Sequence, residues 1–289
     1  MSYQILTDAT ADLSPALTEG LPAVAVIPME VTVGEQAHTY GPGGDLTVDA
    51  FYAAQRGGKF ATTSQINPIT YAEWFERYLA AGQDVVYLGF TSGMSGSFQN
   101  ALLAAGELRE KYPQRQLLCV DTLCASVGEG FLVREAARKQ AEGLDAAQLA
   151  AWGEERKLRV CHWFTVDTFE HLRHGGRVSA VSAVMGTALQ IKPLLHVAAD
   201  GTLEVAEKPR GSKRAMEAQL ARMAKGWTPE ESPLVVVGHG DVPDRAEELC
   251  AAVRERFPQA EIYTAPIGPV IGSHTGPGML ALIFWGSER

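Results

Sequence analysis

The feature that most constrains the fold is a pair of short apolar segments on either side of a helix-like segment. DVVYLGF (residues 84–90) and QLLCVDT (residues 116–122) are rich in apolar and β-branched residues and are bounded by turn residues, and the segment between them, 97–111, is typical of a helix. Continuous apolar strands suit a parallel sheet that is covered on both faces, and a strand–helix–strand order joins parallel neighbours. The first half of the chain is therefore predicted to be an α/β domain with a mostly parallel sheet.

The pattern changes in the second half of the chain. Strand-like segments now dominate, and one of them turns at Asp200–Gly201, a dipeptide typical of tight hairpins. This mixture predicts an α+β arrangement. At 289 residues the chain also exceeds the usual size of one compact domain. We predict an N-terminal α/β domain over residues 1–158 and a C-terminal α+β domain over residues 159–289.

Composition limits the partners of the chain. Lys and Arg total 25 against 34 for Asp and Glu, and a net charge of -9 argues against a broad surface for nucleic acid. No apolar run approaches the ~18 residues of a membrane span, and the first residues show neither a basic leader nor an apolar signal core. The four cysteines form no C-x-x-C pair, so we expect free thiols. These features predict a cytoplasmic protein without nucleic-acid partners.

A hydroxyl-rich loop, TSGMSGSF (residues 91–98), follows the first of the two apolar segments and opens the predicted helix. A helix N-terminus at the carboxyl end of a parallel strand is suited to bind an anion. The loop lacks the G-K-[ST] of a Walker A motif, and with no Lys or Arg it suits a single negative charge approached by hydroxyls. Helix capping by Ser95 or Ser97 explains the same residues equally well.

Two further segments carry candidate polar groups. In ATTSQINP (residues 61–68), hydroxyls precede a proline-containing helix start, and helix capping is the simpler explanation. In IGSHTGPG (residues 271–278), His274 lies in a predicted loop between small hydroxyl residues, where a binding role and a solvated position fit equally well.

Charged side chains and histidines give weaker indications. Arg177 follows a helix that ends in two glycines, and both a surface position and a binding role fit it. A basic cluster at Lys208, Arg210, Lys213 and Arg214 suits either a solvated helix start or docking of an acidic partner. His171 and His174 share one helix face, but no further ligand pattern accompanies them, so no metal is predicted.

Seven motifs in order resemble the DegV family of bacterial fatty-acid-binding proteins. They are TDATADL, TTSQINP, TSGMSGSFQNA, VDTLCASVGEG, GGRVS, IKPLL with DGTLEVAEKPRGSKRA, and GSHTGPG, and they cover the chain from end to end. The resemblance implies a two-domain DegV-like fold that holds a long-chain fatty acid such as palmitate at the domain junction, with the acyl chain in a tunnel. It implies that the carboxylate is bound by Thr63, Ser92, Ser95 and His274. The supporting loop residues would be Ser64, Gly93, Gly96, Arg177, Thr275 and Gly276.

Such a site is chemically reasonable. A carboxylate carries one charge and accepts several hydrogen bonds, so hydroxyls, helix N–H groups and an imidazole can satisfy it without a buried lysine. Burial of the acyl chain adds ~0.8 kcal/mol per methylene, which can supply most of the affinity.

The resemblance also implies a partner. Members of the family present their fatty acid to a separate dihydroxyacetone-kinase-like fatty acid kinase, which phosphorylates the carboxylate to an acyl phosphate. On that basis the chain is a carrier without a cofactor and not an enzyme. It would exchange fatty acid in transient contact with the membrane and dock on the kinase through Arg210, Lys213 and Arg214.

Other functions remain open at this stage. The main alternative is an acyl hydrolase with Ser95 as nucleophile and His274 as base, because G-M-S-G-S nearly matches G-x-S-x-G and departs from it only at Ser97. A regulatory protein that senses a small acid is a further alternative. A nucleotide-binding enzyme is disfavoured because the chain lacks both G-x-G-x-x-G and a Walker lysine.

Overall fold

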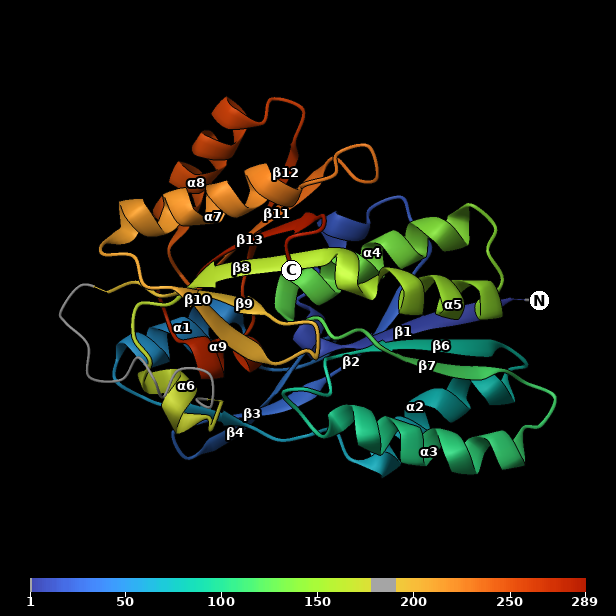
Figure 1. Cartoon of the computed structure of the whole chain (residues 1–289). Helices are drawn as coiled ribbons and strands as arrows, with labels where there is room; N and C mark the ends of the chain where they lie inside the picture. Colours follow the sequence, from blue (N-terminus) through green and yellow to red (C-terminus); the bar gives the residue numbers. More distant parts are fainter. Residues whose placement is uncertain (1, 178–190) are drawn as a thin grey trace.

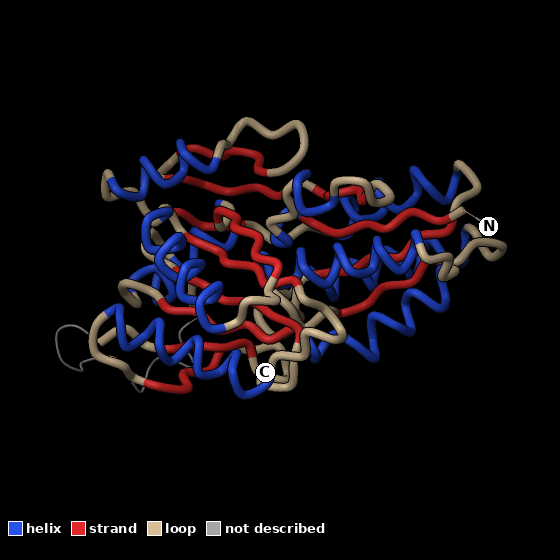
Figure 2. The backbone as a smooth tube through the Cα atoms, turned by 90° about the horizontal axis from the view of Figure 1, so that it is seen from above, coloured by secondary structure: helices blue, strands red, loops and turns tan. Residues whose placement is uncertain are grey.

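The fold consists of three sheets and the helices that cover them. The computed structural model describes residues 2–177 and 191–289, so Val178 and Ser179 of the GGRVS motif lie outside the described residues. The sheets of the described part have four, six and three strands, and Figures 1 and 2 show how the helices are arranged over them. Among the described helices, none is long and apolar enough to cross a bilayer.

The four-stranded sheet is parallel. Its order is β2 (Val24–Ile27), β1 (Tyr3–Asp8), β6 (Asp84–Gly89) and β7 (Leu117–Asp121). One face packs on α2 (Pro68–Ala80) and α3 (Ser97–Lys111), and the other on α4 (Ser126–Ala141) and α5 (Ala146–Arg156) (Figure 1). Because helices cover both faces, every residue of β6 is buried. The predicted parallel α/β sheet is confirmed.

The six-stranded sheet is mixed and contains every described strand after residue 159. Its order is β10 (Leu203–Glu207), β9 (Leu194–Val197), β8 (Val160–Thr165), β13 (Leu280–Trp285), β11 (Leu234–His239) and β12 (Glu261–Pro266). Only the β11–β12 pair is parallel. The helices α7 (Ser212–Gly226) and α8 (Pro243–Arg256) pack on one face of this sheet. This arrangement confirms the α+β prediction for the second half.

The three-stranded sheet was not predicted as a separate element. It is antiparallel, in the order β4 (Gln36–Tyr40), β3 (Met29–Val33) and β5 (Ala61–Thr63), and α1 (Val48–Arg56) follows β4 in the chain. The apolar segment AVAVIPMEVTV (residues 23–33) divides at Pro28 into β2 and β3. Proline has no N–H to donate to a sheet, and the chain changes sheets at that residue.

The helix α4 is buried between the two larger sheets. Val133, Ala136 and Ala137 pack against the four-stranded sheet, whereas Val127 and Phe131 pack against the six-stranded sheet. A helix that is buried on two sides has little surface left for polar residues, so each of its buried polar groups needs a partner within the protein.

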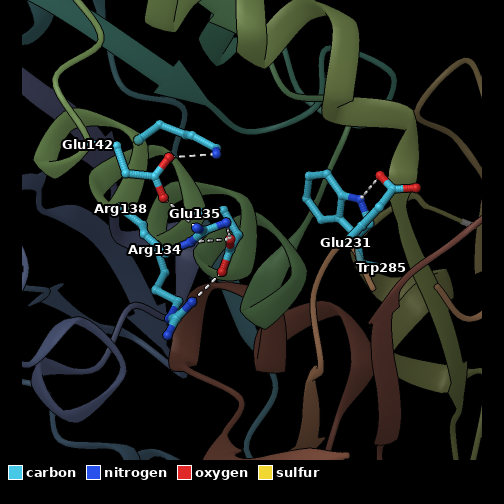
Figure 3. Close-up of polar contacts among 7 residues, drawn as sticks. Arg134, Glu135, Arg138, Glu142, Glu231 and Trp285 are labelled. Carbon is cyan, nitrogen blue, oxygen red and sulfur yellow. Dashed lines mark hydrogen bonds and ion pairs between the residues drawn. The ribbon is translucent and has the colours of Figure 1, made fainter. Parts of the chain in front are cut away.

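The buried glutamate at position 135 of α4 meets this requirement with two arginines. Its carboxylate is paired with Arg134 and accepts a hydrogen bond of 2.8 Å from Arg138 Nη2. Arg138 also pairs with Glu142 one turn further along the helix. Figure 3 shows this group, together with the separate hydrogen bond of 2.9 Å from Trp285 Nε1 to Glu231.

Contacts between loops join the first half of the chain to the second. Arg289 donates hydrogen bonds to the carbonyl oxygens of Leu123, Lys157 (2.8 Å) and Ala198 (3.3 Å), and Thr91 Oγ1 donates to the carbonyl of Gly201 at 2.9 Å. A guanidinium held by several carbonyl oxygens is stabilised without a carboxylate partner.

We propose that the domains divide at residue 158. That position lies in the 3-10 turn Lys157–Arg159, after which the strands that the structure describes all belong to the six-stranded sheet. The division does not separate the packing completely. In addition to α4, the helix α9 (Pro269–Thr275) from the second half packs on β3 and β5 of the first half.

Two buried carboxyl groups lie where β1 meets α4. Thr10 Oγ1 is 2.8 Å from Glu129 Oε2 and also within hydrogen-bond distance of Asp8 Oδ1, while Tyr87 donates to Asp8 Oδ2 at 2.6 Å. One hydroxyl proton cannot serve two carboxylates, so one carboxyl must carry a proton. Burial raises the pKa of Glu129 well above its usual range, and the nearby charge of Asp8 raises it further. We therefore assign the proton to Glu129, which donates to Thr10.

Replacement of Glu129 by glutamine tests the assignment of the proton to this residue. The folded state retains a proton on Glu129 that the unfolded chain releases above about pH 4.5, so the folded state loses stability as the pH rises from there toward the folded pKa. Glu129→Gln removes this loss. We expect its free energy of unfolding to rise relative to that of the unsubstituted protein by up to about 1.4 kcal/mol per pH unit in this window.

Urea unfolding at a series of pH values gives the measurement. Glu107→Gln on the exposed side of α3 is the matched control, and its free energy of unfolding should stay within about 0.5 kcal/mol of that of the unsubstituted protein. Parallel pH profiles for Glu129→Gln and the unsubstituted protein would show that the proton resides elsewhere.

Candidate functional site

The main cavity of the protein lies between the two halves of the chain. It encloses about 880 Å³ of space, including its opening to solvent, and it is lined by residues of both halves. Its body is apolar, with walls formed by Val127, Phe164, Val197, Leu203, Ala281 and Ile283. Its polar residues include Thr63, Ser64, Gln65, Ser95, Arg177 and His274. A mostly apolar pocket with a few convergent polar groups is the usual form of a small-molecule site.

Thr63 and His274 meet at this cavity from different parts of the chain. Thr63 ends β5, and its Oγ1 lies 2.9 Å from His274 Nε2. His274 does not lie in a loop as predicted, because residues 269–275 form α9 and place it in the last helical turn. Pro269 at the first position of that helix favours this conformation, and this signal in the sequence was not used.

The imidazole of His274 is held in its neutral form. Burial, followed by the positive charge of Arg177, lowers the pKa of His274 from 6.5 to about 4. Its Nδ1 is buried and has no hydrogen-bond partner among the described residues. A Cβ atom at Gly175 would lie 2.0 Å from this nitrogen, so a glycine is required there for the ring to fit.

The loop before α3 contributes Ser95. Its hydroxyl donates to Ser97 Oγ at 3.0 Å and accepts from the backbone N–H of Ser97 at 3.2 Å, so it both lines the cavity and supports the helix start. Gly96 allows Gln65 to approach, because a Cβ there would lie 2.9 Å from Gln65 Oε1. Ser95 therefore lines the cavity and accepts from the first helical N–H, whereas the N-cap position itself is Gly96, which offers no side-chain cap.

Arg177 brings the positive charge of the site. Its Nε and Nη2 each donate to the carbonyl of Met94 at 3.2 Å, and its Nη1 donates to the carbonyl of Gly175 at 2.5 Å. Carbonyl oxygens orient the guanidinium but do not neutralise it, so the charge remains available to an anion in the cavity.

Ser92 is the one predicted carboxylate ligand that does not line the cavity. It is exposed, and its backbone N–H donates to Asp121 Oδ1 at 3.1 Å. Gly93 is also exposed. It packs so closely on the 200–201 turn that an added Cβ atom at Gly93 would overlap the backbone of that turn. The spacing in SGMSG did not show which of its two serines faces inward.

The remaining supporting residues lie near the site. Ser64 lines the cavity and donates to Glu30 Oε1 at 3.0 Å, and Thr275 lines it and donates to the carbonyl of Ile271 at 3.2 Å. Gly276 ends α9 with a φ of 71°, a left-handed conformation that favours glycine, and its α-carbon faces the ring of His171.

Sequence reasoning missed four polar residues of the cavity wall, namely Thr10, Gln65, Ser126 and His162. Thr10, Ser126 and His162 are already satisfied within the protein. Ser126 donates to Asp12 Oδ2 at 2.6 Å, and His162 donates from Nδ1 to the carbonyl of Val160 at 3.0 Å and accepts at Nε2 from the N–H of Ala125. Their polar groups are therefore occupied, which is consistent with an apolar ligand at that part of the wall.

The arrangement of Ser95 and His274 differs from that of a serine hydrolase. His274 Nε2 faces Thr63, and Ser95 is hydrogen-bonded to Ser97. A triad also needs an acid on the far nitrogen of the histidine, and none contacts His274 Nδ1 in the described part of the chain. Within residues 2–177 and 191–289, no group of three or more His, Cys, Asp or Glu side chains could hold a metal ion.

Comparisons with known proteins define the family. Residues 2–286 match the model of the family described as "Uncharacterised protein, DegV family". The chain is 35% identical over 287 residues to a DegV domain-containing protein of Clostridium perfringens, covering 99% of this chain and 98% of that protein. The chain therefore belongs to the DegV family, as its motifs indicated.

Two solved structures with the same fold are described by their ligands. A DegV family protein from Thermus thermophilus described as binding fatty acid has a TM-score of 0.86 and 30% identity, covering 99% of this chain and 100% of that one. A stearic-acid-binding protein from Eubacterium ventriosum has a TM-score of 0.86 and 25% identity, covering 99% of both chains. The predicted DegV-like fold class is confirmed.

The low pKa of His274 can be measured directly. Because burial and Arg177 hold the pKa of this imidazole near about 4, we expect its ring resonances in long-range ¹H–¹⁵N NMR spectra of the ligand-free protein to stay constant from about pH 8 to about pH 5.5. Titration of His274 near its ordinary value of 6.5 would contradict the described geometry.

Proposed function

We propose that this protein binds a long-chain fatty acid in the cavity between its two halves. The observation that carries this proposal is the division of one cavity into an apolar body and a polar group formed by Thr63, Ser95, Arg177 and His274. A fatty acid has the matching division into an apolar chain and one anionic end. The fatty acids described for relatives of the same fold support the same ligand class.

The polar group suits a carboxylate without any change of fold. The Thr63 hydroxyl can donate to one carboxylate oxygen while its own oxygen accepts from His274 Nε2–H, since the two atoms are already 2.9 Å apart. Ser95 offers a second hydroxyl, and Arg177 offers the compensating charge. A carboxylate accepts several hydrogen bonds at once, so these donors are complementary to it.

The apolar body suits the acyl chain. Phe164, Ala281 and Ile283 project from the six-stranded sheet and face Val127 of α4. Each methylene buried between them contributes ~0.8 kcal/mol, so a long chain gains more than a short one. This difference favours long-chain acids such as palmitate over small acids, and it makes sensing of a small acid the weaker alternative.

We further propose that the protein presents the carboxylate to a separate dihydroxyacetone-kinase-like fatty acid kinase. In this role it is a carrier that takes up fatty acid during transient contact with the cytoplasmic face of the membrane and needs no cofactor. The basic cluster of Arg210, Lys213 and Arg214 supports docking, because all three side chains are exposed and form no ion pair within the described residues.

Variants of the polar group test the ligand. Protein purified from a bacterial host is denatured and its small molecules are identified by mass spectrometry, and we expect one equivalent of fatty acid. Thr63→Ala, Ser95→Ala and His274→Ala should each weaken fatty-acid binding about 10- to 100-fold, because each loses a hydrogen bond that serves a charged group. Displacement of a fluorescent fatty acid gives the affinities.

The matched control is Ser92→Ala, which removes a serine hydroxyl from the same loop but outside the cavity. We expect its affinity to be unchanged. A loss at Ser92→Ala equal to that at Ser95→Ala would show that the carboxylate lies on the other side of the loop. Protein that is empty and takes up no added fatty acid would refute the proposal, and ester hydrolysis abolished by Ser95→Ala would favour the hydrolase.

Charge reversal tests the docking proposal separately. With the loaded protein as substrate of such a kinase, Arg210→Glu and Arg214→Glu should each lower kcat/KM about tenfold or more, because attraction in the encounter becomes repulsion. Arg77→Glu on α2 reverses a charge far from α7 (Figure 1) and should have no effect. Turnover that is unchanged in the Arg210 and Arg214 variants would place the kinase on another surface and leave fatty-acid binding intact.

A further inference from the structure

A second cavity lies on the opposite face of the six-stranded sheet. Successive strand residues point to opposite faces, so Phe164 and Ala281 line the main cavity while their neighbours Thr165 and Leu280 line the second. The second cavity encloses about 870 Å³, including its opening to solvent. Its other walls come from α7 and α8, which lie together on this side of the sheet (Figure 1).

One end of this cavity is suited to an anion. Ser212 and Lys213 line it at the first turn of α7, where no side chain caps the helix. The N–H groups of an uncapped helix start favour negative charge. Arg245 also lines the cavity but is paired with Asp167 at 3.1 Å, whereas Lys213 has no ion pair among the described residues. Lys213 is therefore the cation that remains available.

One residue of the cavity wall, Gln219, has an amide oxygen that lacks a donor among the described residues. Gln219 is completely buried, and its Nε2 donates to the carbonyls of Trp163 at 3.0 Å and Leu280 at 3.1 Å. Because both partners are acceptors, they determine the orientation of the amide. Its Oε1 has no donor in the described part of the protein and belongs to a side chain that lines the cavity. An orphaned buried acceptor of this kind indicates a missing donor.

The anion-binding start of α7 and the unpaired amide oxygen of Gln219 suit a ligand with two kinds of group. Ser212 and Gln219 are seven residues apart on one helix, which corresponds to about 10 Å along the axis, and the glutamine side chain leans back toward the helix start. Glu248 of α8 lines the same cavity and offers further acceptor oxygens. The ligand therefore carries an anionic group at one end and hydrogen-bond donors several ångströms away.

We propose that this second cavity is a binding site for a polyol phosphate. The phosphate is bound by the start of α7, the hydroxyl of Ser212 and the ammonium group of Lys213, with Arg245 adding positive charge. The hydroxyls of the polyol donate to Gln219 Oε1 and to the Glu248 carboxylate. This site is separate from the fatty-acid cavity and does not depend on the function proposed for it.

Calorimetric titration of the protein with ribose 5-phosphate tests the site, with ribose and inorganic phosphate as the two halves of the probe. We expect saturable one-to-one binding of ribose 5-phosphate. Ribose alone and inorganic phosphate alone should each bind at least about tenfold more weakly, because each leaves one end of the site unsatisfied. Lys213→Ala and Gln219→Met should each weaken binding of the whole probe about tenfold. Gln219→Met should leave the affinity for inorganic phosphate unchanged.

Arg214→Ala is the matched control, since it removes an exposed charge from the next position of α7 but does not line the cavity. We expect no change in its affinity. Gln219 also holds the sheet carbonyls, so if Gln219→Met fails to fold, Glu248→Ala takes its place as the variant that removes an acceptor. The proposal is overturned if ribose 5-phosphate gives no saturable binding, if inorganic phosphate binds as tightly, or if Arg214→Ala weakens binding as much as Lys213→Ala.

Discussion

The structure depends on the burial of one helix between two sheets. Because α4 packs on the four-stranded sheet with one side and on the six-stranded sheet with another, it joins the two halves of the chain. This position forces its polar residues to find partners inside the protein. Glu135 does so with two arginines, and Glu129 does so with the hydroxyls of Thr7 and Thr10.

The main cavity lies where α4 packs against the six-stranded sheet. Val127 at the start of α4 and Thr10 beside Glu129 form part of its wall, opposite side chains of the six-stranded sheet. The polar group lies where elements from both halves meet, since β5 brings Thr63 and α9 brings His274. A ligand in this cavity would therefore contact elements from both halves of the chain.

The βα elements of the first half were predictable because their signals are local. The apolar run of β6 and the helical segment of α3 appear in the structure at almost the predicted bounds. The break between β2 and β3 has only one signal in the sequence, Pro28, because the residues on both sides of it have high β-propensity. The helical position of His274 was missed because glycines and hydroxyls around it suggested a loop.

The sequence by itself determined the family, the parallel sheet of the first half and most of the residue types of the candidate site, because motifs and periodicity are properties of neighbouring residues. Only the tertiary structure decided which of these residues converge. Ser95 faces the cavity and Ser92 faces solvent, although they are three residues apart in one loop. The pairing of Thr63 with His274 spans 211 positions, and contacts of that kind depend on how the sheets pack.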